Sequence, residues 1–208
     1  MIIMYKTSDI YYVIERFFGR LGMKNKCFAV SEAVGCFVIY AAATLLHFVF
    51  NLFGPGALTI LFGAVNESIW EHVKVFSAAY AGYALLQLLW IKEEFRRYVA
   101  AKCAGLYALM GGIIALHCGY TALTGKAVAW IDLAGAAVIV ALAQLLSYKL
   151  VVSRLPLREY FAPAVFLLML YYLMFFSFTI YPPKLELFRD PVSGVFGYPE
   201  NAVEKHWR

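Results

Sequence analysis

The segment NESIWEHVK, residues 66–74, concentrates polar and ionisable side chains at the start of a long apolar run. On a helix, groups three or four residues apart share one side, so several of these side chains can act together. Carboxylates, a hydroxyl and an amine in this arrangement can transfer protons or neutralise a charged substrate. The candidate catalytic residues are therefore Glu67, Ser68, Glu71 and Lys74.

His72 in the same segment, with His47 and Asp132, forms a candidate metal-ligand set. A catalytic zinc takes three protein ligands with N, O or S atoms and lowers the pKa of its bound water to about 7. A nearby carboxylate such as Glu67 could then shuttle protons. The spacings H-E-x-x-H and H-x-x-x-H are both absent. Further side chains expected around the same pocket are Asn66, Trp70, His117, Tyr120 and Asp190.

Purely structural roles are open for the same residues. Ser68 and Glu71 have the spacing of a capping box, and Asn66 is an equally good N-cap. Lys74 can neutralise a neighbouring glutamate in a buried ion pair. Asp132 can cap the helix that begins near it, and the histidines can be hydrogen-bonded structural side chains.

The elements that position these residues are membrane-spanning helices. The 208-residue chain is 63% hydrophobic and only 15% charged, whereas soluble domains carry about 25% charged residues. A membrane span needs about 20 mainly apolar residues. We therefore predict an all-α integral membrane protein with five spans within residues 27–181, at about 27–50, 66–91, 98–118, 127–147 and 160–181.

The net charge of +5 is distributed as expected for contact with a membrane surface, not with nucleic acid. Lysine and arginine concentrate in residues 1–26, 92–102 and 149–158, and the intervening loops have few. The positive-inside rule then places the N-terminus in the cytoplasm and the tail, residues 182–208, outside a plasma membrane. The histidines, the 66–74 segment, Asp132 and Asp190 all fall toward the outer side, which predicts an extracytoplasmic polar pocket.

The sequence also allows predictions for the N-terminal segment, for the first loop and for the cysteines. Residues 8–23, within the cytoplasmic segment 1–26, have apolar side chains on one face and polar ones on the other when drawn as a helix. We therefore predict an amphipathic helix suited to lie on the inner leaflet. A groove on a cytosolic partner is the alternative surface for it. The uncharged loop 51–63 has an apolar second half, so it should dip into the bilayer or pack on the bundle. The four cysteines lie in or beside the spans, where we expect free thiols that pack as small apolar groups.

The stretch from His47 to V-N-E-S-I-W-E-H-V-K, residues 65–74, resembles the signature of a family of uncharacterised bacterial multi-pass membrane proteins. Its pattern is His, a short loop and P-V-N-E-S-x-W-E-H-x-K; Ala64 replaces the proline, and His117 is not part of it. Tyr120-Thr121, Gly125 and Asp132 resemble it too, as does the tail from Y-P-P at 181 through F-R-D-P at 188. The resemblance covers nearly the whole chain and implies a membrane protein without assigning a reaction.

Ser68-x-x-x-His72 is also similar to one element of the alkaline ceramidase and adiponectin-receptor hydrolases, which hold zinc with histidines and aspartate in a membrane bundle. The leading hypothesis is a metal-dependent membrane hydrolase or transferase acting on a lipid or envelope substrate. The alternatives are a transporter or small-solute binding protein coupled through Glu67, Glu71 and Lys74, and a structural assembly partner. Transport needs polar groups on the cytoplasmic halves, where the sequence offers mainly Gln87, Gln144 and Ser147.

Overall fold

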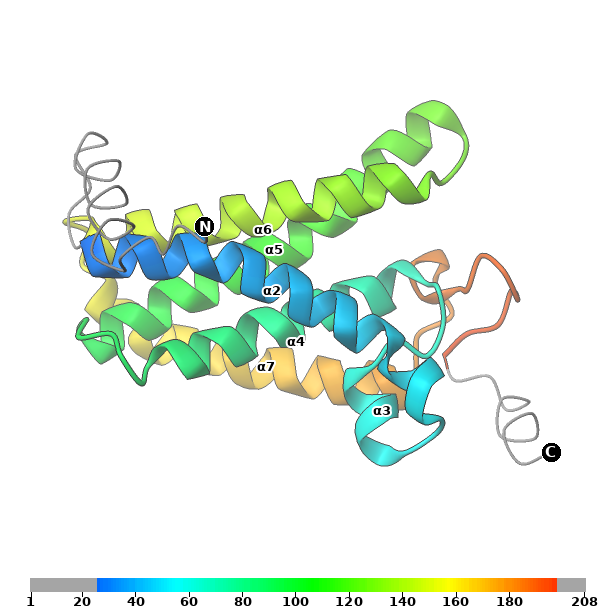
Figure 1. The fold of residues 1–208 in the computed structure, drawn as a ribbon, viewed down its shortest axis with the longest axis horizontal. Helices are drawn as coiled ribbons and strands as arrows, with labels where there is room; N and C mark the ends of the chain where they lie inside the picture. Colours follow the sequence, from blue (N-terminus) through cyan, green and yellow to red (C-terminus); the bar gives the residue numbers. More distant parts are fainter. Residues whose placement is uncertain (1–25, 198–208) are drawn as a thin grey trace, which may run out of the picture.

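The computed structural model describes residues 26–197, which form a bundle of helices without a named strand (Figure 1). The long helices run up and down beside one another. They are α2 (Lys26–Phe53), α4 (Ile69–Gln87), α5 (Phe95–Thr124), α6 (Ala129–Val152) and α7 (Phe161–Ile180). The shorter elements are α3 (Ala57–Phe62), η1 (Leu157–Tyr160) and η2 (Glu186–Phe188). Residues 1–25, which include the predicted amphipathic helix 8–23, lie outside the described residues.

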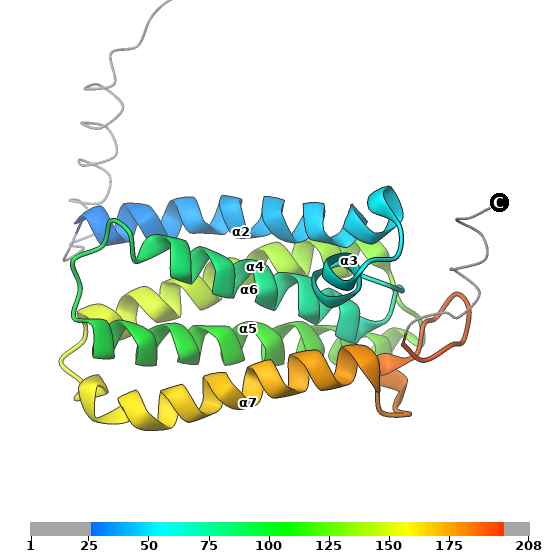
Figure 2. The same ribbon diagram turned by 90° about the horizontal axis from the view of Figure 1, so that it is seen from below.

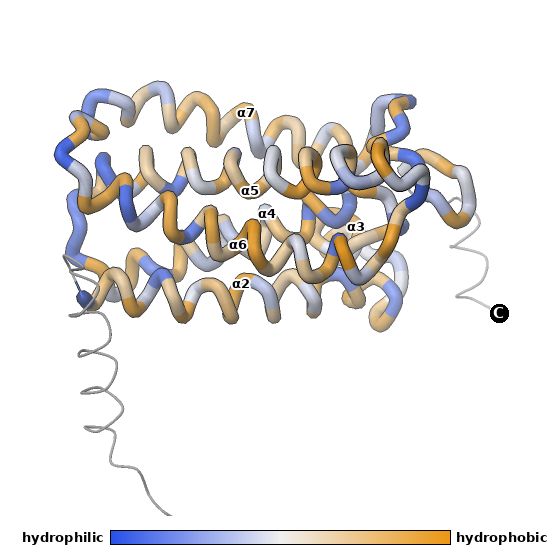
Figure 3. Tube along the Cα trace, turned by 90° about the horizontal axis from the view of Figure 1, so that it is seen from above, coloured by the Kyte–Doolittle hydropathy of each residue, from blue (hydrophilic) through white to orange (hydrophobic). Residues whose placement is uncertain are grey.

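Four helices are long and apolar enough to cross a membrane: α2, α5, α6 and the helix Leu157–Ile180 that contains α7. Apolar residues predominate along the middle of the helices, and hydrophilic residues lie mainly toward the two ends of the bundle (Figure 3). Large apolar side chains of α7 such as Phe166 and Met169 are exposed, as a lipid-facing surface requires. The chain is thus an all-α protein with the helices of a membrane protein. A fifth crossing by α4 stays a prediction.

Helix α4 is not among these four, and many of its residues are buried inside the bundle. It packs against α2 and α5 near the centre of the bundle (Figure 2). Its Val73 and the facing Ile39 of α2 and Leu109 of α5 are fully buried. Close approach relies on glycines, as is common between membrane helices. A Cβ on Gly105 of α5 would overlap the Tyr80 hydroxyl of α4.

The two ends of the bundle differ in chemistry. At one end α2 finishes and α4 begins; we call this the pocket end. At the other, α4 finishes and α5 begins; we call this the basic end, because its loops and helix ends hold Lys92, Arg96, Arg97, Arg154 and Arg158. The α5–α6 hairpin diverges from the other helices at the pocket end (Figure 1). Helix α5 extends beyond the predicted run 98–118 in both directions and stops at Gly125, which has a φ of 71°.

The segments between and after the helices cover the pocket end. Helix α3 packs on α2, α4 and α7, with Phe62 5.8 Å from Phe175 between ring centroids. This confirms that the apolar part of the first loop packs on the bundle. The tail folds back over the same end, where Phe188 is buried and its ring lies 5.0 Å from that of Trp70. The tail therefore adds a wall to the region that the sequence marked as polar.

Candidate functional site

A pocket of about 870 Å³ lies at the pocket end, between α2, α4, α5, α6 and the tail. The predicted polar candidates supply much of its lining. They are His47, Glu67, His72, His117, Asp132 and Asp190. Side chains from distant parts of the sequence are thereby brought to one space.

His47, Glu67 and His72 form a compact group on one wall of this pocket. One ligand atom from each residue can be chosen so that all lie within 4.8 Å of one another. The Glu67 carboxylate reaches both rings, with one oxygen 3.6 Å from His47 Nε2 and the other 3.8 Å from His72 Nε2. The imidazole rings stack at 5.2 Å between centroids. Two protonated imidazoles this close would repel, whereas a shared cation would satisfy both nitrogens and the carboxylate.

Helix α4 fixes the orientation of the His72 ring. Its Nδ1 lies 2.9 Å from the carbonyl oxygen of Ser68. A carbonyl only accepts hydrogen bonds, so Nδ1 carries a proton, and in the neutral imidazole the lone pair is then on Nε2. Nε2 is the nitrogen that faces Glu67. A backbone carbonyl that holds the far nitrogen of a metal-binding histidine is a common second partner in metal sites.

The turn that carries Glu67 is held by the tail. The Asn66 side chain accepts from the Ser68 amide at 2.8 Å and donates to the Gly197 carbonyl at 2.8 Å. Burial opposes ionisation of the Asp190 carboxyl, but hydrogen bonds outweigh it and hold its pKa below the usual value. Its donors are the Ser193 hydroxyl and the backbone amides of Val192, Ser193 and Glu67. Asp190 therefore acts on the pocket by fixing the backbone of Glu67.

A second group lies on the α5–α6 side of the pocket. His117 Nδ1 donates to one oxygen of Asp132 at 3.0 Å, and the Tyr120 hydroxyl donates to the other at 2.8 Å. In the neutral imidazole this arrangement puts the lone pair on His117 Nε2. The structure thus pairs Asp132 with His117 and places Glu67, which we had assigned to proton transfer, beside His47 and His72.

Glu71 and Lys74 do not line the pocket. Their side chains are buried and form an ion pair at 2.6 Å. Glu71 also accepts from the Val65 amide at 2.9 Å, and Lys74 donates to the Ile60 carbonyl at 3.1 Å. The pair therefore ties the loop and α3 to α4. Neither residue lines the pocket, so these two predicted catalytic residues are placed where they position the loop, α3 and α4.

The cap of α4 matches the expected capping box only in part. Ser68 is the N-cap and its hydroxyl accepts from the Glu71 amide at 3.4 Å. The Glu71 side chain turns to Val65 instead of back to the Ser68 amide, which Asn66 occupies. Trp70 also lies away from the pocket, buried against the tail. Ser68 thus serves the helix and His72, and the indole serves packing.

The three-residue group fits zinc by distance. In a tetrahedral site with bonds of about 2.0–2.1 Å, neighbouring ligand atoms lie about 3.3 Å apart. Each histidine Nε2 is close to this distance from one Glu67 oxygen, at 3.6 and 3.8 Å. The three ligand atoms together lie within 4.8 Å, so a zinc ion would need the side chains to close by at most about 1.5 Å. Two histidines and one carboxylate are also a donor set of catalytic zinc sites, in which a further position is left for water.

The model of a family of unknown function, DUF6512, matches residues 23–198. The chain belongs to DUF6512. The match includes every side chain of the pocket. No curated protein and no solved structure matches the chain. DUF6512 has no assigned activity, so function must be argued from the geometry of this member.

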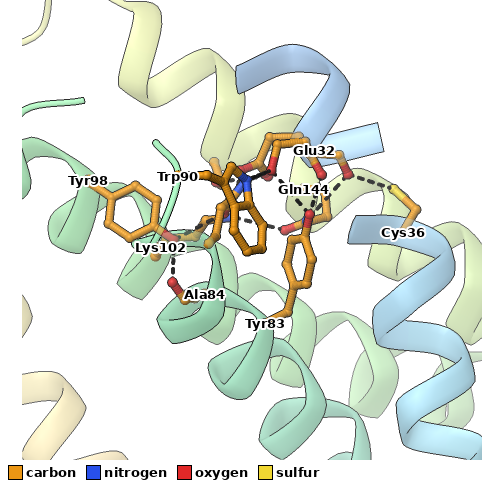
Figure 4. A network of polar contacts seen from close by, with 11 residues as sticks. Glu32, Cys36, Tyr83, Ala84, Trp90, Tyr98, Lys102 and Gln144 are labelled. Carbon is orange, nitrogen blue, oxygen red and sulfur yellow. Dashed lines mark hydrogen bonds and ion pairs between the residues drawn. The ribbon is translucent and has the colours of Figure 1, made fainter. Parts of the chain in front are cut away.

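The DUF6512 region also contains a second polar cluster, near the basic end, which the sequence pattern alone did not predict (Figure 4). Glu32 of α2 and Lys102 of α5 are buried and form an ion pair at 2.6 Å. The Glu32 carboxylate also accepts from Gln87 at 3.0 Å and from Ser147 at 3.3 Å. Lys102 donates further to Gln144 at 3.1 Å. The cluster joins α2, α4, α5 and α6 through charged and amide groups.

Aromatic side chains complete this cluster. The Lys102 ammonium lies 5.3–6.0 Å from the ring centroids of Phe28, Tyr80 and Tyr98. Cation–π attraction is strongest where water is excluded, as here. The sequence contains one signal for this cluster, because Glu32 is the only acidic residue in the apolar run 27–50. Lys102 gives no such signal, because it follows the basic residues within 92–97 and resembles part of their loop. In the structure α5 begins at Phe95 and places Lys102 inside the bundle.

Proposed function

We propose that this DUF6512 protein is a multi-pass membrane protein that binds zinc, or a similar divalent metal, through His47, Glu67 and His72. We further propose that it hydrolyses or transfers a group on a lipid or envelope-derived substrate in the pocket. The observation that carries the proposal is the convergence of the three ligand atoms within 4.8 Å. Bound zinc would supply an activated water and a positive charge for a developing anion.

His117 is the best-placed proton acceptor for such a reaction. It lines the pocket, while its Nδ1 is held by Asp132 at 3.0 Å. The carboxylate stabilises the imidazolium that forms when Nε2 takes up a proton. The Tyr120 hydroxyl donates to the other Asp132 oxygen at 2.8 Å, and this second hydrogen bond fixes the orientation of the carboxylate toward His117.

The rest of the pocket suits an amphiphilic substrate. Its lining includes Phe76, Ile113, Leu133 and Ala136, which provide an apolar surface beside the histidines. Trp130 and Leu123 are strongly exposed near the tip of the diverging α5–α6 hairpin. An exposed tryptophan at a helix end is typical of the membrane–water interface. A lipid could therefore place its polar group between the two histidine groups and its chain along the apolar lining.

We propose that α4 crosses the membrane as the fifth span, with the basic end cytoplasmic and the pocket end extracytoplasmic. Support comes from the excess of lysine and arginine in the loops and helix ends of the basic end. The up-and-down course of α4 between the ends of the bundle agrees with it.

Metal analysis of protein purified in detergent without chelator tests the function. We expect near-stoichiometric zinc in the wild type and its loss in His72→Ala and Glu67→Ala. His117→Ala is the matched control: it removes a pocket histidine outside the ligand set and should keep the metal while abolishing turnover. A folded wild type without metal, or retention of metal in His72→Ala, would overturn the proposal.

Solute transport is the second candidate, and the Glu32–Lys102 cluster favours it. Ionisable groups inside a membrane bundle are common on ion and proton paths, and this cluster puts charge on the half that the sequence had shown as nearly apolar. A cellular phenotype lost in Glu32→Gln but kept in His72→Ala would favour transport. The opposite pattern would favour the metal enzyme.

A further inference from the structure

A second cavity, of about 290 Å³, lies on the outside of the bundle toward the basic end. Its walls come from α4, α5 and α7. Helices α4 and α7 each pack along α5 but hardly touch one another. Figure 2 shows α5 between them. The hydrogen bond from Tyr171 to Ser77, 3.1 Å long, closes the gap near the middle of α4. A groove floored by α5 remains between that bond and the basic end.

The groove is apolar along its length. Ala81 and Ala84 of α4 leave room on one side, and Val99, Leu106, Val165 and Leu168 line the others. Lys102 reaches the groove, yet its ammonium is bound to Glu32 at 2.6 Å. The ammonium is therefore already committed inside the bundle. Such a lining offers little to orient a polar ligand, and it suits a flexible hydrocarbon chain.

A basic side chain lies at the mouth of the groove. The Arg96 guanidinium lies 5.7 Å from the ring centroid of Phe161, which lines the groove next to Phe95. Arg96 is exposed, and no acidic partner is seen for it among the described residues. Two other arginines of the basic end, Arg158 and Arg97, are engaged. Arg158 lies 3.5 Å from Glu94, and Arg97 binds backbone carbonyls at the end of α6 and just beyond, Leu155 at 2.8 Å among them.

We propose that this groove binds an anionic glycerophospholipid of the cytoplasmic leaflet. One acyl chain lies along α5 between α4 and α7, and the phosphate pairs with Arg96. The basic character of this end of the bundle favours an anionic head group, since lysine and arginine near a membrane surface attract anionic lipid. Guanidinium is well suited to phosphate, because its planar donors can bind two oxygens at once. The inference rests on the proposed membrane orientation and is independent of the metal site.

Native mass spectrometry of the full chain, with phosphatidylglycerol or phosphatidylcholine of the same acyl chains added, tests the site. We expect the wild type to prefer phosphatidylglycerol by about fivefold, the contribution of one arginine at an anionic surface. Arg96→Gln should remove the preference and keep weak binding of both lipids. Arg154→Gln is the matched control, an exposed arginine of the same end that is not at the groove, and should keep the preference.

The chain-binding part has its own pair of variants. Ala81→Phe fills the groove and should weaken binding of both lipids, whereas Leu86→Phe enlarges an exposed side chain of α4 outside it. Equal binding of both lipids by the wild type would overturn the proposal. So would equal effects of Arg96→Gln and Arg154→Gln, or of Ala81→Phe and Leu86→Phe. Zinc content measured on the same samples should not change, which separates this test from that of the metal site.

Discussion

At the scale of single residues, Glu67 and Glu71 have different roles although they are only four positions apart. Both belong to the same polar segment, and both were expected on one helical stripe. The helix begins at Ile69, so Glu67 lies in the preceding turn and its carboxylate meets two histidines at the pocket. Glu71 lies in the first turn, where it is buried with Lys74. The residue that can hold a metal is therefore the one outside the helix.

Lys74→Met should destabilise the protein by about 3–5 kcal/mol, because it leaves the Glu71 carboxylate buried without a counter-charge. The double variant Glu71→Gln, Lys74→Met should recover most of that loss, since both charges are gone and glutamine can still accept from the Val65 amide. Thermal unfolding in detergent measures both. A double variant as unstable as the single one would show that the pair does more than neutralise charge.

At the scale of elements, the apolar runs predicted the long helices, because a run of about 20 apolar residues has the length and composition of a membrane-spanning helix. They did not predict which helix is central. Helix α4 packs against α2 and α5, and this depends on contacts between segments, which periodicity in one segment cannot show. The Glu32–Lys102 pair was missed for the same reason: its members are 70 positions apart. His47 and His72 were found because both lie near helix ends that topology alone brings together.

The tail is the element that completes the candidate site, and two of its glycines test this. Gly194 and Gly197 both have φ above 70°, so alanine strains the backbone by about 1 kcal/mol at either position. A Cβ at Gly197 would also lie 2.6 Å from Pro182 Cγ, whereas the nearest atom to one at Gly194 is 3.7 Å away. Gly197→Ala should therefore displace the carbonyl that Asn66 binds.

We expect Gly197→Ala to weaken zinc binding by about tenfold, the usual effect of losing a partner behind a metal ligand. Gly194→Ala, with the same backbone strain and no overlap, should have a much smaller effect. Competition with a zinc-sensitive dye measures both affinities. Equal affinities in the two variants would show that the contact between the tail and Asn66 does not support the site.

At the scale of the whole molecule, the bundle separates two kinds of chemistry along its length. The pocket end carries the histidines and carboxylates of the candidate site, and the basic end carries the lysines and arginines. Buried lysine–carboxylate pairs lie between: Glu71–Lys74 toward the pocket end and Glu32–Lys102 toward the basic end. Helix α4 contributes to both, through Lys74 and through Gln87. Whether α4 crosses the membrane therefore decides whether one helix connects the two faces.

The number of crossings can be read from which side of the membrane single cysteines face. Gly56 and Arg154 are exposed in loops separated by α4, α5 and α6, and Val192 is exposed in the tail beyond α7. In a variant without the four native cysteines, Gly56→Cys and Arg154→Cys should face opposite sides if α4 crosses. They should face the same side if it does not. Val192→Cys should oppose Arg154→Cys in both cases, because only α7 separates them, and so serves as the control.

Labelling with a membrane-impermeant maleimide, before and after the cells are opened, makes the measurement. We expect Gly56→Cys and Val192→Cys to react in intact cells and Arg154→Cys to react only after lysis. That pattern would place the candidate metal site on the outer face and the groove at Arg96 on the inner one. Labelling of Gly56→Cys and Arg154→Cys from one side would leave four crossings. Helix α4 would then be a buried core helix, and it would not connect the two sides of the membrane.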